Sequence, residues 1–221
     1  SRSSAASDVY KRQLLARWGI PCTQDVVVRK GEDAAQFCKT LKAPLAVKIL
    51  SSDIPHKTEA GGVILGVRDE LALQDAVDTV LTNAAKHAPT ARIDGVLVAE
   101  MISDGVEMLL GVVMDPSFGP TIALGMGGVQ AELLRDVTHR IAPFDEETAM
   151  AMVDELKGSA LLRGYRGRPR ADIQALVKAV SELSHAVWQH RDRIAEVDIN
   201  PLFVRPDGLG VVAADALVCL R

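Results

Sequence analysis

The residues best suited to chemistry lie in the segment AVKILSSDIPHKTEAGGV, positions 46–63. Lys48 stands inside an apolar run with the pattern of a buried strand, where an ammonium group requires an anionic partner. A polar loop with His56 follows, and then the pair Gly61-Gly62, whose backbone N–H groups can approach a phosphate because no Cβ is in the way. The combination predicts a site where phosphate is bound and transferred. The same pattern also fits a strand with a snorkelling lysine and an ordinary glycine hairpin.

A second candidate group lies near the end of the chain, in the segment EVDINP, positions 196–201. Glu196, Asp198 and Asn200 fall on one face of a strand, because side chains alternate with period two. Asp215 is expected on the partner strand of the same hairpin, within the apolar run VVAADAL. Carboxylate and amide oxygens are the ligands that Mg²⁺ takes beside ATP phosphates, so we predict a metal site here. A polar outer face on an edge strand is the alternative.

Strands and helices must position these residues, and the hydrophobic periodicity predicts where those elements lie. A long helix with an apolar stripe is expected over 70–87, directly after the His56 loop. The other expected helices are 14–18, 32–41, 145–156 and 172–191, and the expected strands are 25–29, 45–50, 63–65, 95–101, 107–114, 121–124, 137–142, 194–204 and 210–219. This order predicts an α+β or α/β fold rather than a regular doubly wound sheet.

Composition bounds the class of protein. The chain has 221 residues, of which 48% are hydrophobic and 24% charged, as in ordinary soluble globular proteins. The net charge of −4, from 25 basic and 29 acidic residues, argues against a nucleic acid or an anionic membrane as the main partner. The cysteines, Cys22, Cys38 and Cys219, have no metal or redox spacing, which predicts reduced thiols and a cytoplasmic location.

The first residues do not look native. Ser3–Gln13, SSAASDVYKRQ, resembles the translation of a transposon-end sequencing adapter. We therefore expect 1–13 to be a non-native tail and natural sequence to begin near Leu14, as part of something longer.

Taken in order, the motifs resemble one family. The segments VKI, PHKTEAGGV, VAEM, GVEMLLGVVMDPSFGP, GMGG, GYRGRP and EVDINP are similar to the ATP-grasp domain of NDP-forming acyl-CoA synthetases. That family includes the ADP-forming acetate–CoA ligases and relatives of the succinyl-CoA synthetase β chain. The resemblance covers the chain from Leu14 to its end. It implies an ATP-grasp fold of two lobes with a nucleotide cleft between them, the smaller lobe about 23–98 and the larger about 99–221 plus 14–22.

The resemblance also implies roles for individual residues. Lys48 would hold the nucleotide phosphates, and His56 would accept a phosphoryl group beside the nucleotide. The loop with Gly61 and Gly62 would cover the phosphates. The remaining positions are the adenine and nucleoside contacts in and after VAEM, namely Glu100, Met101 and Glu107, and the Mg²⁺ ligands Asn200 and Asp215 with Asp198 beside them.

The implied activity is the reaction acyl-CoA + ADP + phosphate ⇌ acid + CoA + ATP, with Mg²⁺ as cofactor. This chain would transfer a phosphoryl group between ATP or ADP and a phosphohistidine. Its partners would be CoA-binding and ligase domains, fused upstream or on a separate α subunit, which bind CoA and phosphate, and a small carboxylic acid substrate. No nucleic acid or membrane partner is expected.

Two alternatives stay open from the sequence. The chain could be a regulatory nucleotide-binding module of a multi-domain protein acetyltransferase. It could also be a different ATP-grasp ligase that joins a carboxylate to an amine, in which case His56 has no role. An intact set of Lys48, His56, Asn200 and Asp215 favours catalysis over regulation, because a module that only binds nucleotide has less need of His56.

Overall fold

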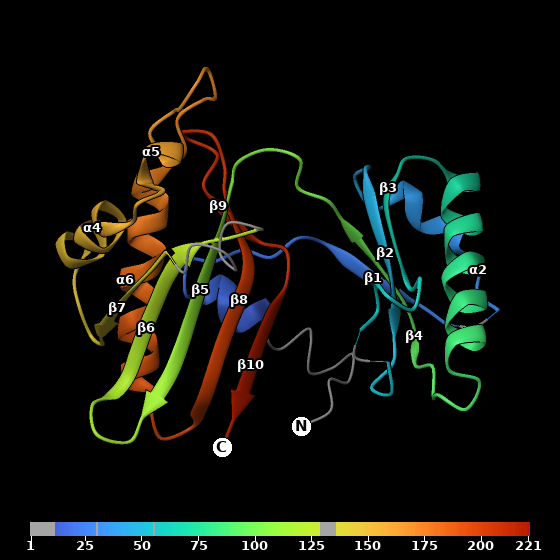
Figure 1. Ribbon diagram of the computed structural model, residues 1–221, viewed down its shortest axis with the longest axis horizontal. Coiled ribbons are helices and arrows are strands. Elements are labelled where there is room, and N and C mark those ends of the chain that lie inside the picture. Colours follow the sequence, from blue (N-terminus) through green and yellow to red (C-terminus); the bar gives the residue numbers. More distant parts are fainter. Residues whose placement is uncertain (1–11, 30, 55, 129–135) are drawn as a thin grey trace. The chain divides into compact units, whose positions relative to one another are not determined.

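The computed structural model describes residues 12–29, 31–54, 56–128 and 136–221, which form two compact units (Figure 1). One unit spans Thr23–Ile102, and the other combines the segment up to Cys22 with Ser103–Arg221. Most of the expected tail 1–13 lies outside the described residues, as does Pro55 of the His56 loop. Both units combine helices with an antiparallel sheet, which confirms the predicted mixed fold class.

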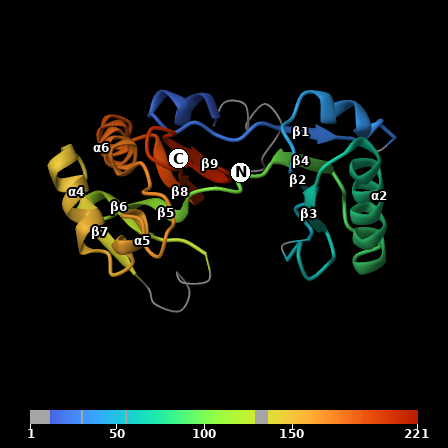
Figure 2. The same cartoon turned by 90° about the horizontal axis from the view of Figure 1, so that it is seen from above.

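In the unit Thr23–Ile102, four antiparallel strands form a sheet with a long helix along one face (Figure 1, Figure 2). The strand order is β1-β4-β2-β3. The strands are β1 (Asp25–Val28), β2 (Leu45–Leu50), β3 (Val63–Val67) and β4 (Gly95–Glu100). Helix α2 covers Glu70–His87 as predicted, whereas the helix expected over 32–41 is a short 3-10 helix, η1 (Ala34–Lys39).

Helix α2 begins where the sequence provides a cap and packs through one apolar stripe. Asp69 is the N-cap, and its side chain accepts a hydrogen bond from the backbone N–H of Ala72 at 2.8 Å. The buried stripe of the helix consists of Leu73, Ala76, Val77, Val80 and Ala84. It shares a hydrophobic core with alternate residues of β2, namely Leu45, Val47 and Ile49. Because side chains alternate along a strand, Lys48 lies on the face of the sheet opposite α2.

The larger unit is built on a second antiparallel sheet, with the strand order β10-β8-β5-β6-β7 and β9 paired with β8 (Figure 1). The strands are β5 (Val106–Asp115), β6 (Gly119–Met126), β7 (Val137–Ile141), β8 (Ile194–Val204), β9 (Val211–Ala213) and β10 (Ala216–Leu220). The helices are α4 (Glu146–Glu155), α5 (Ser159–Leu162) and α6 (Ile173–Gln189), preceded by a helical segment at 12–17. Helix α6 packs its apolar face on the sheet and shares a core with alternate residues of β5 and β8 (Figure 2).

The final hairpin departs from the prediction. Instead of one strand over 210–219, the structure has β9 and β10, separated by Ala214 and Asp215. Both short strands pair with β8, and the ladder is interrupted opposite Pro201. The backbone N–H of Ala214 donates to the carbonyl of Pro201 at 3.0 Å, but proline has no N–H with which to return the bond. We therefore attribute the break between β9 and β10 to Pro201 on the neighbouring strand β8.

Two further observations bear on the predictions from composition. Cys22, Cys38 and Cys219 are free thiols, as expected. Among the described residues, no helix has the length and apolar character needed to cross a membrane.

Candidate functional site

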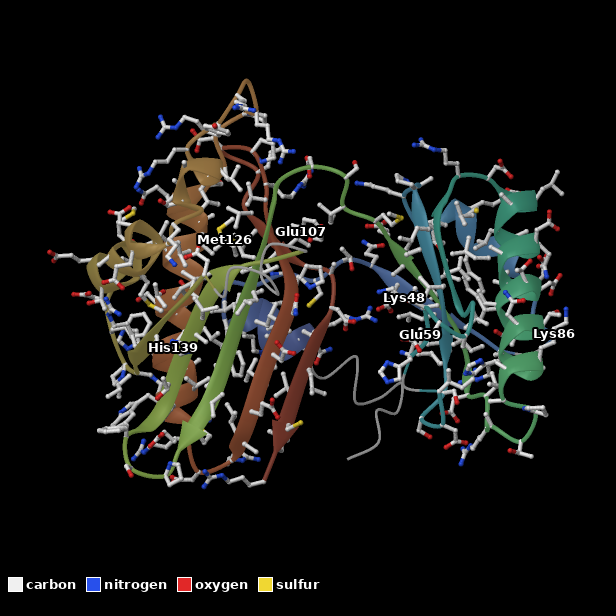
Figure 3. The ribbon with its side chains drawn as sticks, in the orientation of Figure 1. Lys48, Glu59, Lys86, Glu107, Met126 and His139 are labelled. Atoms are coloured by element: carbon white, nitrogen blue, oxygen red, sulfur yellow. The ribbon has the colours of Figure 1, made fainter. Side chains whose placement is uncertain are left out.

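Lys48 lies in the middle of β2, between β4 and β3 (Figure 3). Its neighbours across the sheet are Leu97 on β4 and Val63 on β3, so it stands on an apolar stretch of the face away from α2. The side chain is half-buried, and no carboxylate in the described part of the chain forms an ion pair with it. A partly desolvated ammonium group without a protein counterion favours binding of an external anion.

The loop after β2 is a closed turn with His56 at its start. Three backbone hydrogen bonds close it: Ala60 N–H to the carbonyl of His56 (3.2 Å), Gly61 N–H to Thr58 (3.0 Å) and Gly62 N–H to Lys57 (2.8 Å). The last two bonds, with Gly61 at a φ of 62°, form a Schellman motif, which requires glycine at the left-handed position. We call residues 56–62 the His56 turn.

The hydrogen bonds of the His56 turn give Gly61 and Gly62 a different structural role from the expected one. We expected their N–H groups to approach a phosphate, but in this structure both donate hydrogen bonds inside the His56 turn. Gly62 also lies against Ile49, because a Cβ at Gly62 would stand 2.6 Å from the Ile49 Cγ2. The glycines therefore allow the turn to close against β2. The role of Gly61 and Gly62 in covering nucleotide phosphates stays a prediction.

The start of the loop is held by side chains that sequence reasoning did not single out. The Asp53 carboxylate accepts a hydrogen bond from the backbone N–H of Arg92 at 2.8 Å, and the Ser51 hydroxyl donates to the Arg92 carbonyl at 2.7 Å. Because these contacts join segments about forty positions apart, no local pattern could have revealed them. They join Ser51 and Asp53 to the segment before β4, while the His56 side chain is exposed.

Glu100 is the last residue of β4 in the same unit, and Met101 follows it. The Glu100 carboxylate accepts a hydrogen bond from the backbone N–H of Lys42 at 2.8 Å, and the Met101 N–H donates to the carbonyl of Pro44 at 2.9 Å. The sulfur of Met101 lies 3.1 Å from the backbone nitrogen of Gly66. These contacts hold the end of β4 against the loop before β2. The expected contact of Glu100 and Met101 with a nucleoside stays a prediction.

In the larger unit, the predicted metal ligands lie next to one another at the broken part of the final hairpin. Asp198 and Asn200 are exposed, as the alternation predicted. Val197, before Asp198, and Ile199, between the two, are buried. Asp215 is exposed opposite Asn200, whose N–H donates to the Asp215 carbonyl at 3.2 Å. The three side chains therefore project from one region of the sheet.

This region carries a concentrated negative charge. Although solvent reaches the Asp198 carboxylate, partial burial raises its pKa above the usual value, and the charges of Glu196 and Asp215 raise that pKa further. Mutual repulsion of this kind is relieved when a cation binds.

The donor set fits Mg²⁺ held jointly with a ligand. Within the described ranges, no three His, Cys, Asp or Glu side chains gather closely enough to hold a metal ion by themselves. Mg²⁺ is commonly bound by one or two carboxylates together with substrate phosphates and water. Two carboxylates and an amide oxygen are consistent with Mg²⁺ that takes its other ligands from substrate phosphates and water. They are not consistent with a site in which the protein supplies every ligand.

Glu107 lies beside the second glycine-rich segment, GMGG at 125–128 (Figure 3). The backbone N–H of Gly127 donates to the Glu107 carbonyl at 2.8 Å, and a Cβ at Gly127 would stand 2.8 Å from the Glu107 carbonyl carbon. A Cβ at Gly128 would stand 3.0 Å from the Glu107 Oε2 atom. The glycines let this loop pass directly over Glu107, whose contact with a nucleoside stays a prediction.

Asp136 has structural contacts that the sequence did not reveal. Asp136 is 5% exposed, and its two carboxylate oxygens accept hydrogen bonds from the backbone N–H groups of Lys157 (2.9 Å) and Gly158 (2.7 Å). A Cβ at Gly158 would lie 3.2 Å from the same carboxylate. A single aspartate before a short strand gives no sign of such partners, because both are backbone groups in a distant segment.

The predicted site residues thus form two groups. Lys48, the His56 turn, Glu100 and Met101 belong to the smaller unit. The larger unit carries Glu107 and the oxygen donors Asp198, Asn200 and Asp215. Each group is assembled from segments that are far apart in the chain. One group contains a lysine ammonium and an imidazole, and the other contains carboxylate and amide oxygens.

Comparison with known proteins shows which family the chain belongs to. The profile of the ATP-grasp domain family matches residues 2–220. The chain belongs to the ATP-grasp domain family, and within it to the ADP-forming acyl-CoA synthetases. It is 37% identical over 218 residues to the β subunit of ADP-forming acetate–CoA ligase II from Pyrococcus furiosus, covering 99% of this chain and 92% of that subunit. It is 35% identical to the 4-hydroxybutyrate–CoA ligase (ADP-forming) of Nitrosopumilus maritimus, of which it covers 30%.

Solved structures show the same relationship. The chain resembles the PH1788 protein of Pyrococcus horikoshii with a TM-score of 0.84 and 35% identity, covering 96% of this chain and 90% of that one. It also resembles the dinucleotide-forming acetyl-coenzyme A synthetase 1 of Ca. Korarchaeum cryptofilum, in complex with coenzyme A and Ca-AMPCP, with a TM-score of 0.85 and 36% identity over 95% of this chain and 90% of that one. The chain therefore spans nearly the whole of separate β subunits and under a third of a single-chain ligase.

Proposed function

We propose that this chain is the nucleotide-binding part of an ADP-forming acyl-CoA synthetase and transfers a phosphoryl group between ATP or ADP and His56. The observation that carries the proposal is the match to a β subunit over 99% of this chain, together with the presence of Lys48, His56, Asn200 and Asp215. A related synthetase has been solved with Mg-AMPPCP and a phosphohistidine segment pointing towards the nucleotide binding site.

The roles of the residues follow from the chemistry of phosphoryl transfer. Such reactions depend mainly on positioning and on neutralising phosphate charge. Lys48 would bind the phosphates through its ammonium group, which forms no ion pair within the described ranges. A ring nitrogen of His56 would form the N–P bond while the bond between the γ-phosphorus and the bridging oxygen breaks, and ADP leaves with that electron pair. The reverse step returns the phosphoryl group to ADP.

Asp198, Asn200 and Asp215 are the residues that would hold Mg²⁺. When bound, the ion supplies positive charge to the phosphate oxygens. The chain's own contribution would be to keep two carboxylates and an amide close together, on β8 and in the bend between β9 and β10, where their repulsion would be relieved on binding.

The rest of the reaction belongs to other parts of the enzyme. We infer that CoA-binding and ligase domains, on the same polypeptide or on a separate α subunit, bind CoA and phosphate and join the acyl group of a small carboxylic acid to CoA. The length relationship supports this division, because single-chain relatives are about three times as long as the region matched here. We place the reaction in the cytoplasm, where the three free thiols stay reduced.

The test is transfer of label from ATP to this chain. The chain, together with its CoA-binding and ligase partner, is incubated with γ-labelled MgATP, and acid-labile label is mapped by proteolysis. We expect label on the peptide with His56 in the wild type and in His87→Ala, and none on that peptide in His56→Ala. His87 is a matched control because it is the other histidine of the smaller unit and ends α2. Equal labelling of this chain in His56→Ala and wild type would overturn the proposal.

A further inference from the structure

We propose that Asn83 is a positioning residue for His56, acting from helix α2 through the carbonyl of Gly61. The inference rests on the proposed role of His56 as phosphoryl acceptor and adds a residue that holds the acceptor in place. Asn83 lies in the last turns of α2 and is half-buried.

The contact between Asn83 and the His56 turn is direct. The Nδ2 atom of Asn83 donates to the carbonyl oxygen of Gly61 at 3.0 Å, across 22 positions of the chain. The fit is also steric, because a Cβ at Gly61 would stand 2.9 Å from that Nδ2 atom. The φ of 62° favours glycine at this position, and the absence of a Cβ lets the Asn83 amide lie close to it.

The position of Gly61 is transmitted to His56 through backbone hydrogen bonds. The Gly61 N–H donates to Thr58, the Gly62 N–H to Lys57, and the Ala60 N–H to the carbonyl of His56 itself. On the other side of the turn, the Ile49 N–H donates to the carbonyl of Gly62 at 2.8 Å, next to Lys48. Asn83 therefore joins α2, the His56 turn and the strand of Lys48 into one connected unit.

A positioning residue is needed here because the His56 side chain is exposed and forms no hydrogen bond among the described residues. Among the residues that the structure describes, the backbone of the His56 turn is what positions the ring. Phosphoryl transfer is sensitive to placement, since a displacement of about 1 Å can lower a rate by about a hundredfold. Loosening the turn should therefore reduce phosphoryl transfer more than nucleotide binding.

The experiment compares Asn83→Asp with Thr82→Asp in the chain assembled with its CoA-binding and ligase partner. Asn83→Asp keeps the size of the side chain but replaces the donor with an oxygen that repels the Gly61 carbonyl. Thr82→Asp adds the same charge to the same part of α2 at an exposed position, so it controls for charge. Asn83→Ala serves as a second variant that removes the amide without adding charge.

Three quantities are measured: the rate of His56 labelling from γ-labelled MgATP, the Kd of MgATP, and hydrogen exchange of the amides of Gly61 and Gly62. For both Asn83 variants we expect labelling to be slower by about tenfold or more, with the Kd of MgATP within about twofold of wild type. We also expect exchange of the two glycine amides to be faster by about tenfold. Thr82→Asp should resemble wild type in all three.

The outcomes separate this inference from the proposed function. Labelling and exchange in the Asn83 variants that match Thr82→Asp would overturn the role of Asn83 and leave phosphohistidine formation intact. A loss of MgATP affinity equal to the loss of labelling rate would also overturn it, because that is the result of general damage to the unit. Absence of label on His56 in the wild type would overturn the proposed function and this inference with it.

Discussion

The backbone N–H of Asn200 donates to the backbone carbonyl of Asp215 at 3.2 Å, at the place where the ladder between β8 and the last strands is interrupted. The bond keeps the two residues opposite each other although Pro201 removes the next donor from the ladder. An amide oxygen and a carboxylate thereby reach the same side of the hairpin, with Asp198 on the same strand as Asn200. This local arrangement leads to the first prediction.

Replacing Asp215 by asparagine should weaken Mg²⁺-dependent turnover. The substitution keeps the shape of the side chain and removes one negative charge from the group that also includes Asp198. We expect a loss of about 2–4 kcal/mol of transition-state stabilisation, as for removal of one charge-stabilising group, with partial recovery at high Mg²⁺. The measurement is turnover against Mg²⁺ concentration at fixed ATP. Asp207→Asn, in the exposed turn of the same hairpin, should leave the curve unchanged; an equal curve for Asp215→Asn would remove Asp215 from the ligand set.

Replacing Lys48 by alanine should abolish detectable MgATP binding. The half-buried ammonium group has no protein counterion among the described residues, so its attraction is available to the phosphates. Removing one partner of a charged contact of this kind costs about 2–5 kcal/mol. Isothermal titration of MgATP measures the effect. Lys86→Ala, on the exposed side of α2, is the control, and wild-type affinity in Lys48→Ala would count decisively against the nucleotide assignment.

The ion pair between Asp104 and Arg205 should make stability depend on pH. Arg205 binds Asp104 through two hydrogen bonds, of 2.9 and 3.0 Å, and this lowers the pKa of the Asp104 carboxyl. A carboxyl whose pKa is lower in the folded state stabilises the fold above its unfolded pKa of about 3.9, and the effect is lost as the pH falls through the folded value.

Asp104→Asn should therefore lower the free energy of unfolding at pH 7 by about 1 kcal/mol or less, because the two side chains are 34% and 37% exposed. Urea unfolding at a series of pH values should show this difference shrink as the pH falls below the unfolded pKa of about 3.9 and through the lower folded pKa. Asp192→Asn, at an exposed site, serves as the reference. A difference that stays constant down to the lowest pH would show that the ion pair is not its source.

Replacing Asp136 by alanine should destabilise the larger unit strongly. The substitution removes a buried carboxylate and leaves the part-buried backbone N–H groups of Lys157 and Gly158 without their acceptors. Each unsatisfied buried donor costs about 1–3 kcal/mol, so we expect a loss of about 2–5 kcal/mol in chemical unfolding. Asp154→Ala removes a carboxylate that only pairs with Arg163 at the surface and should cost about 1 kcal/mol or less. Similar losses for both variants would contradict this account of Asp136.

Much of the framework could be predicted from local patterns. Helix α2 was predicted with both ends correct, because an apolar stripe of period 3.6 runs through it. Strand β8 was also predicted over its full length, since buried and exposed residues alternate along it. The break between β9 and β10 could not be predicted from the residues of 210–219, because its cause is Pro201 on the neighbouring strand.

The sequence by itself determined the kinds of group available and their local order: Lys48 within a strand, His56 and two glycines after it, and oxygen donors on alternate positions of β8. Local propensity and side-chain alternation are properties of neighbouring residues, so they are readable without a fold. Only the tertiary structure decided that Asn83 holds the carbonyl of Gly61, that Asp53 holds the N–H of Arg92, and that both glycine N–H groups close a turn. These contacts join distant segments, and which donor meets which acceptor is settled by packing of the whole unit.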